Sequence, residues 1–235
     1  MKSRERTALA AAVQKVFEAL DWHGLGEIYF HERGEAELRT RHARLVQLGE
    51  ALAQAVCARV PRGGASLWVG AGLAELPVLL AEAMLLQRTV VAANLRGREC
   101  ELLDRALRAA GPLPGVAFVA DDARQVAGSR TFDHLGCISV FTDPETWPLL
   151  SDVAYGRIAP VQLDVTRFVA ERDEAQALAR GLFARLGRPG WITTSGEEAP
   201  WFLEAAGAAG ASYEADDLMV ETAMVGDPVG FLRVT

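Results

Sequence analysis

The sequence has few cysteines, no excess of positive charge and no long apolar run. Its 3 cysteines, Cys57, Cys100 and Cys137, lie far apart without a CxxC pair, which indicates free thiols in a reducing compartment rather than a disulfide framework. The longest apolar stretch, 76–86, is broken by Glu82 and is too short to cross a bilayer. No signal-peptide pattern follows the basic N-terminus. We therefore expect a cytoplasmic protein without membrane contact.

The charge is acidic and unevenly distributed. The 235 residues carry 24 basic and 31 acidic side chains, a net charge of −7, and 50% are hydrophobic. Such a composition argues against a disordered chain, and a general nucleic-acid binder would need a basic face to displace counterions. Residues 190–235 carry 1 basic and 8 acidic side chains, so they hold the whole excess. An acidic rim there, with Glu197 and Glu198, would suit a cationic or amine-bearing acceptor, although it could also be a solvated surface.

Residues 1–60 have helical periodicity. Apolar side chains recur at helical spacing along 9–20 and again along 35–60, with Gly24 and Gly26 between the two stretches. We interpret residues 1–60 as a helical N-terminal cap and residues 61–235 as the domain that it covers. The 4 histidines lack the close spacing of a zinc site, so we expect no metal.

After residue 61 short apolar runs alternate with helical stretches. This alternation predicts a parallel sheet covered on both faces, because parallel strands need crossover helices. The expected strands are 67–69, 90–93, 116–120, 138–141 and 191–195, and the expected helices are 73–87, 99–110 and 171–186. The last two strand-like runs, 218–225 and 229–234, are too close for a crossover and must form an antiparallel hairpin. The predicted fold class is α/β, a three-layer sandwich with a seven-stranded, mostly parallel sheet.

A glycine turn, Gly70-Ala71-Gly72, joins the first expected strand to a helix. Such a turn offers backbone N–H groups and a positive helix terminus to a ligand. The dinucleotide pattern GxGxxG would end at Glu75, whose carboxylate would repel a pyrophosphate, and a Walker A sequence is absent. The spacing GxGxG instead ends at Ala74, which favours a ligand without phosphate. The turn could also serve only to connect the two elements.

The order of these elements resembles the class I S-adenosylmethionine-dependent methyltransferases over residues 61–235. The resemblance implies a Rossmann-like sheet with S-adenosylmethionine as the cofactor. It also implies that Gly70, Ala71 and Gly72 wrap the methionine part of the cofactor, while Asn94 and Leu95 lie beside its ribose.

The same resemblance implies an adenine site and a substrate loop. Asp121, Asp122 and Ala123 follow the third strand, where the family places a polar residue beside the adenine amine. Phe141 opens the loop after the fourth strand and is expected at the cofactor, and Asp143 in the same loop is the candidate catalytic residue.

Asp143-Pro144 occupies the place of the [DN]PP[YF] motif of amino-group methyltransferases. Glu145 and Thr146 replace the second proline and the aromatic residue, so the pair could also be an ordinary turn. Tyr155, Asp164 and His134 are further candidates for acid–base chemistry, with structural roles as the alternative for each.

Three substitutions separate the sequence from the family pattern. Trp68 stands where the family has an acidic residue that orients the cofactor's ammonium group, Asn94 replaces the ribose-binding acid, and Ala74 replaces the third glycine. A neutral acceptor such as Asn94 makes weaker hydrogen bonds than a carboxylate.

Three functional interpretations follow. The first is a methyltransferase acting on a small-molecule acceptor, which the acidic charge favours over nucleic acid. The second is a methyltransferase-like scaffold that has lost catalysis, as Trp68 and Asn94 suggest. The third is an enzyme of the same fold that transfers the aminobutyrate group of S-adenosylmethionine, as nicotianamine synthase-like proteins do.

Two copies of the chain could pair as a homodimer through the helical N-terminus or the hairpin edge.

Overall fold

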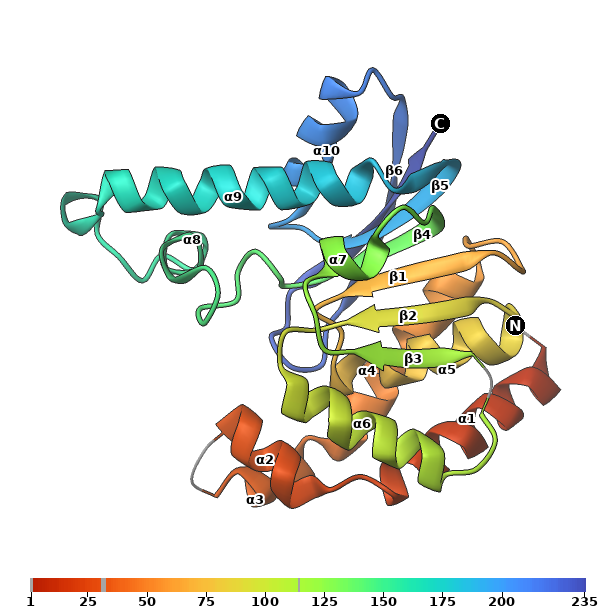
Figure 1. The fold of residues 1–235 in the computed structure, drawn as a ribbon. Coiled ribbons are helices and arrows are strands. Elements are labelled where there is room, and N and C mark those ends of the chain that lie inside the picture. The colour runs from red at the N-terminus through yellow and green to blue at the C-terminus, as the bar shows by residue number, and fades with distance from the viewer. Residues whose placement is uncertain (1, 31–32, 114) are drawn as a thin grey trace.

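A single seven-stranded sheet organises the part of the chain that the computed structural model describes, residues 2–30, 33–113 and 115–235 (Figure 1). Its strand order is β3-β2-β1-β4-β5-β7-β6. The first five strands are parallel, whereas β7 runs antiparallel to both β5 and β6. This arrangement confirms the predicted fold class, including the C-terminal hairpin. The strands are β1 Ala65–Val69, β2 Thr89–Ala93, β3 Val116–Val119, β4 Phe132–Cys137, β5 Leu186–Ser195, β6 Tyr213–Glu221 and β7 Pro228–Val234.

Helices cover both faces of the sheet and create two apolar cores. Alternate residues of a strand point to opposite faces, so Trp68 belongs to one core while its neighbours Leu67 and Val69 belong to the other. Figure 1 shows α1, α4, α5 and α6 on one side and α7, α9 and α10 on the other. The helices of these two layers are α1 Ser3–Glu18, α4 His42–Cys57, α5 Leu76–Leu85, α6 Gly97–Ala109, α7 Ala123–Ala127, α9 Val165–Phe183 and α10 Ala199–Ala208.

The N-terminal helices pack against one another and against α5 and α6, which cover one face of the sheet. Besides α1 and α4, they include α2, Trp22–Phe30, and α3, Gly34–Thr40. The predicted interruption at Gly24 and Gly26 is wrong, because α2 runs through both glycines. A Cβ on Gly26 would lie 2.7 Å from the Cα of Glu35, so glycine allows α2 and α3 to approach closely. The predicted single helix over 35–60 is in fact divided between α3 and α4.

The predicted position of the fourth strand is wrong. The strand is Phe132–Cys137, and the apolar run 138–141 forms the loop that follows it. Asp133 and His134 near its start disguise this strand, because charged and polar residues are rare in doubly buried strands. Both side chains are satisfied by partners from distant parts of the sequence.

Two further boundaries differ from prediction. Strand β6 begins at Tyr213, five residues before the expected start, and residues 222–227 connect it to β7. Helix α9 begins at Val165, where Asp164 accepts a hydrogen bond from the Arg167 N–H and caps the helix. Before it lie the short helix α8, Pro148–Ala154, and a single 3₁₀ turn.

None of the helices in the described residues is long and apolar enough to cross a membrane.

Candidate functional site

A cavity of about 890 Å³ lies at the carboxyl ends of the parallel strands. In open α/β sheets this edge is where ligands bind, because the strand ends and the following loops converge there. The loops after β1, β2, β3 and β4 all reach the cavity, and residues of α2, of α9 and of the β6–β7 connection contribute to its wall together with Tyr155 just after α8. The predicted site residues on the wall are Gly70, Gly72, Asn94, Leu95, Asp121, Asp122, Ala123 and Asp143.

The glycine turn is held against a polar cluster that the sequence analysis did not identify. A Cβ on Gly72 would overlap Glu99 Oε1 and lie 2.7 Å from Tyr29 Oη, so a larger residue there would displace these two side chains. Tyr29 comes from α2 and Glu99 from the first turn of α6, and the tyrosine hydroxyl donates a hydrogen bond to Glu99. Ala71 does not line the cavity, but its carbonyl accepts a hydrogen bond of 3.0 Å from Asn94 Nδ2.

Glu99 connects the turn to the end of β2. Its side chain is 1% exposed. Its Oε1 accepts the Leu73 N–H at 3.3 Å, and its Oε2 lies 3.4 Å from the donor Asn94 Nδ2. The sequence carries a signal for this position, since Glu99 lies four residues before Leu103 on the apolar stripe of α6. A carboxylate on such a stripe must be buried, and a buried carboxylate needs donors or a ligand.

Burial dominates the electrostatics of this cluster. Desolvation raises the pKa of Glu75 to about 7, although the Gly72 N–H, which donates to Glu75 Oε2 at 2.9 Å, lowers it. Desolvation also raises the pKa of Glu99, against the opposing effects of the Tyr29 hydroxyl and Arg96. Burial and the nearby Glu99 carboxylate raise the pKa of Tyr29. Among the residues that the structure describes, Glu75 and Glu99 form no ion pair.

Leu95 and the residues predicted for adenine line another part of the cavity wall. Asp122 caps α7, accepts the Arg124 N–H at 2.8 Å and forms an ion pair with the Arg124 side chain, which lowers its pKa. Asp121 is exposed at the cavity, and Ala123 is buried beside it. Leu95, just after β2, is 65% exposed on the cavity wall, which provides an uncovered apolar surface for a planar ring.

The loop after β4 places its two predicted residues differently. Asp143 lines the cavity, where its carboxylate lies 3.5 Å from Arg96 and accepts the Glu145 N–H at 3.1 Å. Phe141 does not reach the cavity wall. Its ring is 1% exposed and packs against three aromatic side chains, Trp147, Trp201 and Phe202.

Glu198 lies beneath this loop rather than on an acidic rim. It is fully buried and accepts the Phe141 N–H at 2.7 Å, and desolvation raises its pKa to about 7. Glu197 and Glu198 do not line the cavity, and Asp216 pairs with Arg59 on the hairpin. The C-terminal acidic residues named here therefore do not supply the charge of the cavity. Among the described residues, no group of three or more His, Cys, Asp or Glu side chains is arranged to hold a metal.

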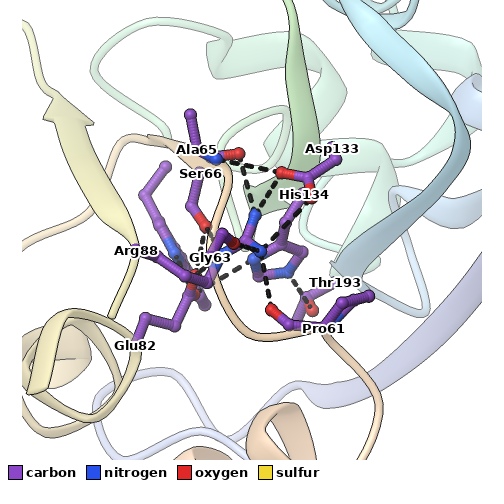
Figure 2. A network of polar contacts seen from close by, with 10 residues as sticks. Pro61, Gly63, Ala65, Ser66, Glu82, Arg88, Asp133, His134 and Thr193 are labelled. Atoms are coloured by element: carbon purple, nitrogen blue, oxygen red, sulfur yellow. Dashed lines mark hydrogen bonds and ion pairs between the residues drawn. The ribbon is translucent and has the colours of Figure 1, made fainter. Parts of the chain in front are cut away.

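A second polar network lies near the start of β1 and β4, away from the cavity (Figure 2). Arg88 is its centre and has a fully buried side chain. Its Nε donates to Ser66 Oγ at 2.8 Å and lies 3.3 Å from Glu82 Oε2. Its terminal nitrogens bind the Asp133 carboxylate and the carbonyls of Pro61, Gly63 and Ala65.

Glu82 is the second junction of the network. Its Oε1 accepts the Trp68 indole N–H at 2.8 Å and lies 3.0 Å from His134 Nδ1. The other ring nitrogen of His134 is 2.9 Å from Thr193 Oγ1. Burial raises the pKa of Glu82, but His134, Ser66 and Trp68 outweigh that effect and hold the pKa below its usual value. His134 and Trp68 thus have structural partners, Glu82 on α5 for both and Thr193 on β5 for His134.

Solved structures share this fold at low sequence identity. TrmN from Thermus thermophilus aligns with a TM-score of 0.52 and 20% identity, over 78% of this chain and 48% of that chain. This chain therefore spans about half the length of TrmN. A methyltransferase from Pyrococcus furiosus aligns with a TM-score of 0.50 and 14% identity, over 79% and 82% of the two chains. The chain has the Rossmann-like fold of the class I methyltransferases.

Sequence comparison adds no closer assignment. No protein-family model matches the chain, and no curated protein matches it. The structural likeness therefore establishes the fold, and the function rests on the chemistry of the cavity.

Proposed function

We propose that this protein is an S-adenosylmethionine-dependent methyltransferase that acts on a small-molecule acceptor. The observation that carries the proposal is the cavity at the carboxyl ends of β1 to β4, with the glycine turn on its wall and the half-buried Glu75 and buried Glu99 carboxylates beside that turn. This is the edge at which open α/β sheets bind ligands. S-adenosylmethionine, when bound, would supply a carbon made electrophilic by its positive sulfur.

The wall residues fit the parts of that cofactor. The half-buried Glu75 and the buried Glu99 carboxylates would hold the ammonium group of its methionine end. That ammonium would supply the positive charge with which neither carboxylate is paired among the described residues. Asn94 would hydrogen-bond the ribose hydroxyls, and Leu95 would cover the adenine ring beside Asp121. Glycine at position 72 lets the backbone of the turn lie close to Glu99, since a Cβ there would overlap the Glu99 carboxylate. Carboxylates at positions 75 and 99 would thus compensate for Trp68, which occupies the usual acidic position.

The chain's own contribution to the reaction would be alignment and exclusion of water. Methyl transfer needs the acceptor held in line with the reacting carbon, and a well-oriented pair of reactants removes much of the entropic barrier. Residues of α2 and of the loop after β4 enclose the cavity from two sides. We also propose that residues 1–60 act as the cap of this site, since Tyr29 and Phe30 of α2 form part of its wall.

A thermal-unfolding titration with S-adenosylmethionine and S-adenosylhomocysteine tests cofactor binding. Saturation at 100 times the dissociation constant stabilises a protein by about 2.7 kcal/mol, which for a chain of this size raises the unfolding midpoint by roughly 5 °C or more. An unchanged midpoint at millimolar ligand would contradict the proposal. Analysis of the nucleoside by-product then identifies the transferred group. S-adenosylhomocysteine indicates methyl transfer, whereas methylthioadenosine indicates transfer of the aminobutyrate group.

A further inference from the structure

The structure separates the three acid–base candidates outside the glycine turn. His134 is buried in the network around Glu82, and Asp164 caps α9. Tyr155, at the end of α8, lines the cavity. It is thus the one of the three that can meet a ligand in the cavity.

Tyr155 is hydrogen-bonded to a buried carboxylate. Its hydroxyl lies 3.0 Å from Oδ2 and 3.3 Å from Oδ1 of Asp227, in the β6–β7 connection. Ser139 Oγ donates to the same Oδ2 at 2.7 Å, and Thr142 Oγ1 is 3.3 Å from the tyrosine hydroxyl. The backbone of Ser139 has a positive φ of 55°, which is uncommon for serine. The chain therefore leaves the extended conformation of β4 at this residue.

Asp227 is a buried carboxyl group close to the cavity. Its side chain is 6% exposed, and no ion pair to it occurs among the described residues. Its hydrogen-bond partners Ser139 and Tyr155 form part of the cavity wall, as does Thr142 beside the tyrosine hydroxyl. The other charged groups near Tyr155 are Glu197 and Arg157; the guanidinium of Arg157 lies 4.7 Å from the centre of the tyrosine ring and 3.9 Å from Asp152.

We propose that Tyr155 and Asp227 form the acceptor subsite and that the acceptor is an amine that binds as its ammonium ion. This inference rests on the proposed function. A buried carboxylate without a cation favours a positive ligand, and the phenol oxygen can accept a hydrogen bond from that ligand while it donates to Asp227. The ammonium must lose a proton before its nitrogen can act as a nucleophile.

The proton transfer can be written for named atoms. One ammonium proton moves to Tyr155 Oη as the phenolic proton moves to an oxygen of Asp227, so the amine becomes neutral and the aspartate becomes a carboxylic acid. The nitrogen lone pair then forms the bond to the transferred carbon, and the electron pair of the broken carbon–sulfur bond stays on sulfur. Tyr155 remains neutral before and after the step, which agrees with its pKa being raised by burial and by Asp227.

Isothermal titration with sinefungin and S-adenosylhomocysteine tests the subsite without knowledge of the acceptor. Sinefungin carries a protonated amine where the transferable methyl group would be, and S-adenosylhomocysteine carries none. We expect the wild-type protein to bind sinefungin at least tenfold more tightly. In Asp227→Asn the preference should fall below about threefold while the affinity for S-adenosylhomocysteine stays the same. Asp152→Asn removes an exposed carboxylate of α8 and should retain the full preference.

Tyr155→Phe provides a second test that leaves the carboxylate in place. We expect it to weaken sinefungin binding about threefold and to leave S-adenosylhomocysteine binding unchanged; it decides the matter if Asp227→Asn does not fold. Equal affinity of the wild-type protein for both ligands, or an unchanged preference in Tyr155→Phe, would overturn the subsite. Failure of the wild-type protein to bind either ligand would instead overturn the proposed function.

Discussion

Both ends of the central sheet hold buried or half-buried carboxylates, but only one end pairs them with a cation. Near the start of β1 and β4, Glu82 and Asp133 are paired with Arg88, and His134 completes the network. At the carboxyl ends, Glu75 and Glu99 have hydrogen-bond donors without an ion-pair partner in the described chain. The pKa of Glu82 is lowered accordingly, while desolvation raises those of Glu75 and Glu99.

The difference distinguishes a structural network from a binding site. A buried charge is tolerated when a countercharge and hydrogen bonds offset its desolvation. The Arg88 network meets that condition within the chain, so it stabilises the fold as it stands. At the cavity end, the desolvation of the carboxylates is offset only when a proton or a cationic ligand is bound. This is expected where residues serve ligand binding rather than stability.

Removal of the buried guanidinium should have the largest effect. Arg88→Met leaves Glu82 and Asp133 without their cation, and breaking a buried pair in this way costs about 3–5 kcal/mol of unfolding free energy. Urea unfolding followed by circular dichroism measures the change. The control is Arg98→Met, which breaks the exposed pair with Glu27 and should cost less than about 1 kcal/mol. Equal effects of the two substitutions would contradict the structural role of the network.

Glu75→Gln should alter the pH dependence of stability. The folded protein holds the Glu75 proton up to a pKa of about 7, against an ordinary value of 4.5, so this group's contribution to stability is fully present below pH 4.5 and is lost as pH rises to about 7. Glutamine does not ionise, so the variant does not lose stability over this pH range. Its free energy of unfolding at pH 8 should exceed that of the wild type by on the order of 2 kcal/mol, and no such gain is expected at pH 4.5.

Glu82→Gln is the matched variant at the other end of the sheet. Because the folded pKa of Glu82 is lowered, its ionised form stabilises the protein above the unfolded pKa, and that contribution is lost as pH falls through the folded pKa. The variant should therefore be less stable than the wild type at neutral pH. Urea unfolding at pH 4.5, 6 and 8 tests both variants, and changes of the same sign at pH 8 would remove the contrast.

Tyr29→Phe should have a smaller effect. The substitution removes the hydroxyl that donates to Glu99, and one lost hydrogen bond of this kind costs about 1 kcal/mol. Hydrogen exchange at the Leu73 amide, which lies 3.3 Å from both Tyr29 Oη and Glu99 Oε1, should become faster. Unchanged protection of that amide would show that α2 does not support the glycine turn.

The sequence predicts the fold through its repeated pattern of apolar runs and helical stretches, and it fails where polar residues are buried. Residues 132–137 form a strand although Asp133 and His134 interrupt the apolar pattern, because Arg88 and Glu82 satisfy them from 45 and 52 positions away respectively. No local rule contains such a pairing. The glycine turn and the residues after β2 and β3 lie at the cavity, a position that strand order alone predicts.

The remaining site residues depend on tertiary contacts. Tyr29 reaches the turn only because α2 packs against α6, and Asp227 meets Tyr155 across 72 positions of sequence. Phe141 is the opposite case, a residue that the sequence places at the site and the structure does not. Its position in the loop suggested a cofactor contact, but its ring is buried among other aromatic side chains. Glu99 alone had a readable signal, a carboxylate on an apolar helical stripe.

One titration tests most directly whether the buried Glu99 carboxylate helps to bind the amino-acid end of the cofactor. The wild-type protein and Glu99→Gln are each titrated with S-adenosylhomocysteine and methylthioadenosine by isothermal calorimetry. Methylthioadenosine keeps the adenosine part and lacks the amino-acid end with its ammonium group. We predict one site per chain, at least tenfold weaker binding of S-adenosylhomocysteine by Glu99→Gln, and unchanged binding of methylthioadenosine. The absence of binding by the wild-type protein at millimolar ligand, or equal binding of S-adenosylhomocysteine by both proteins, would contradict the account.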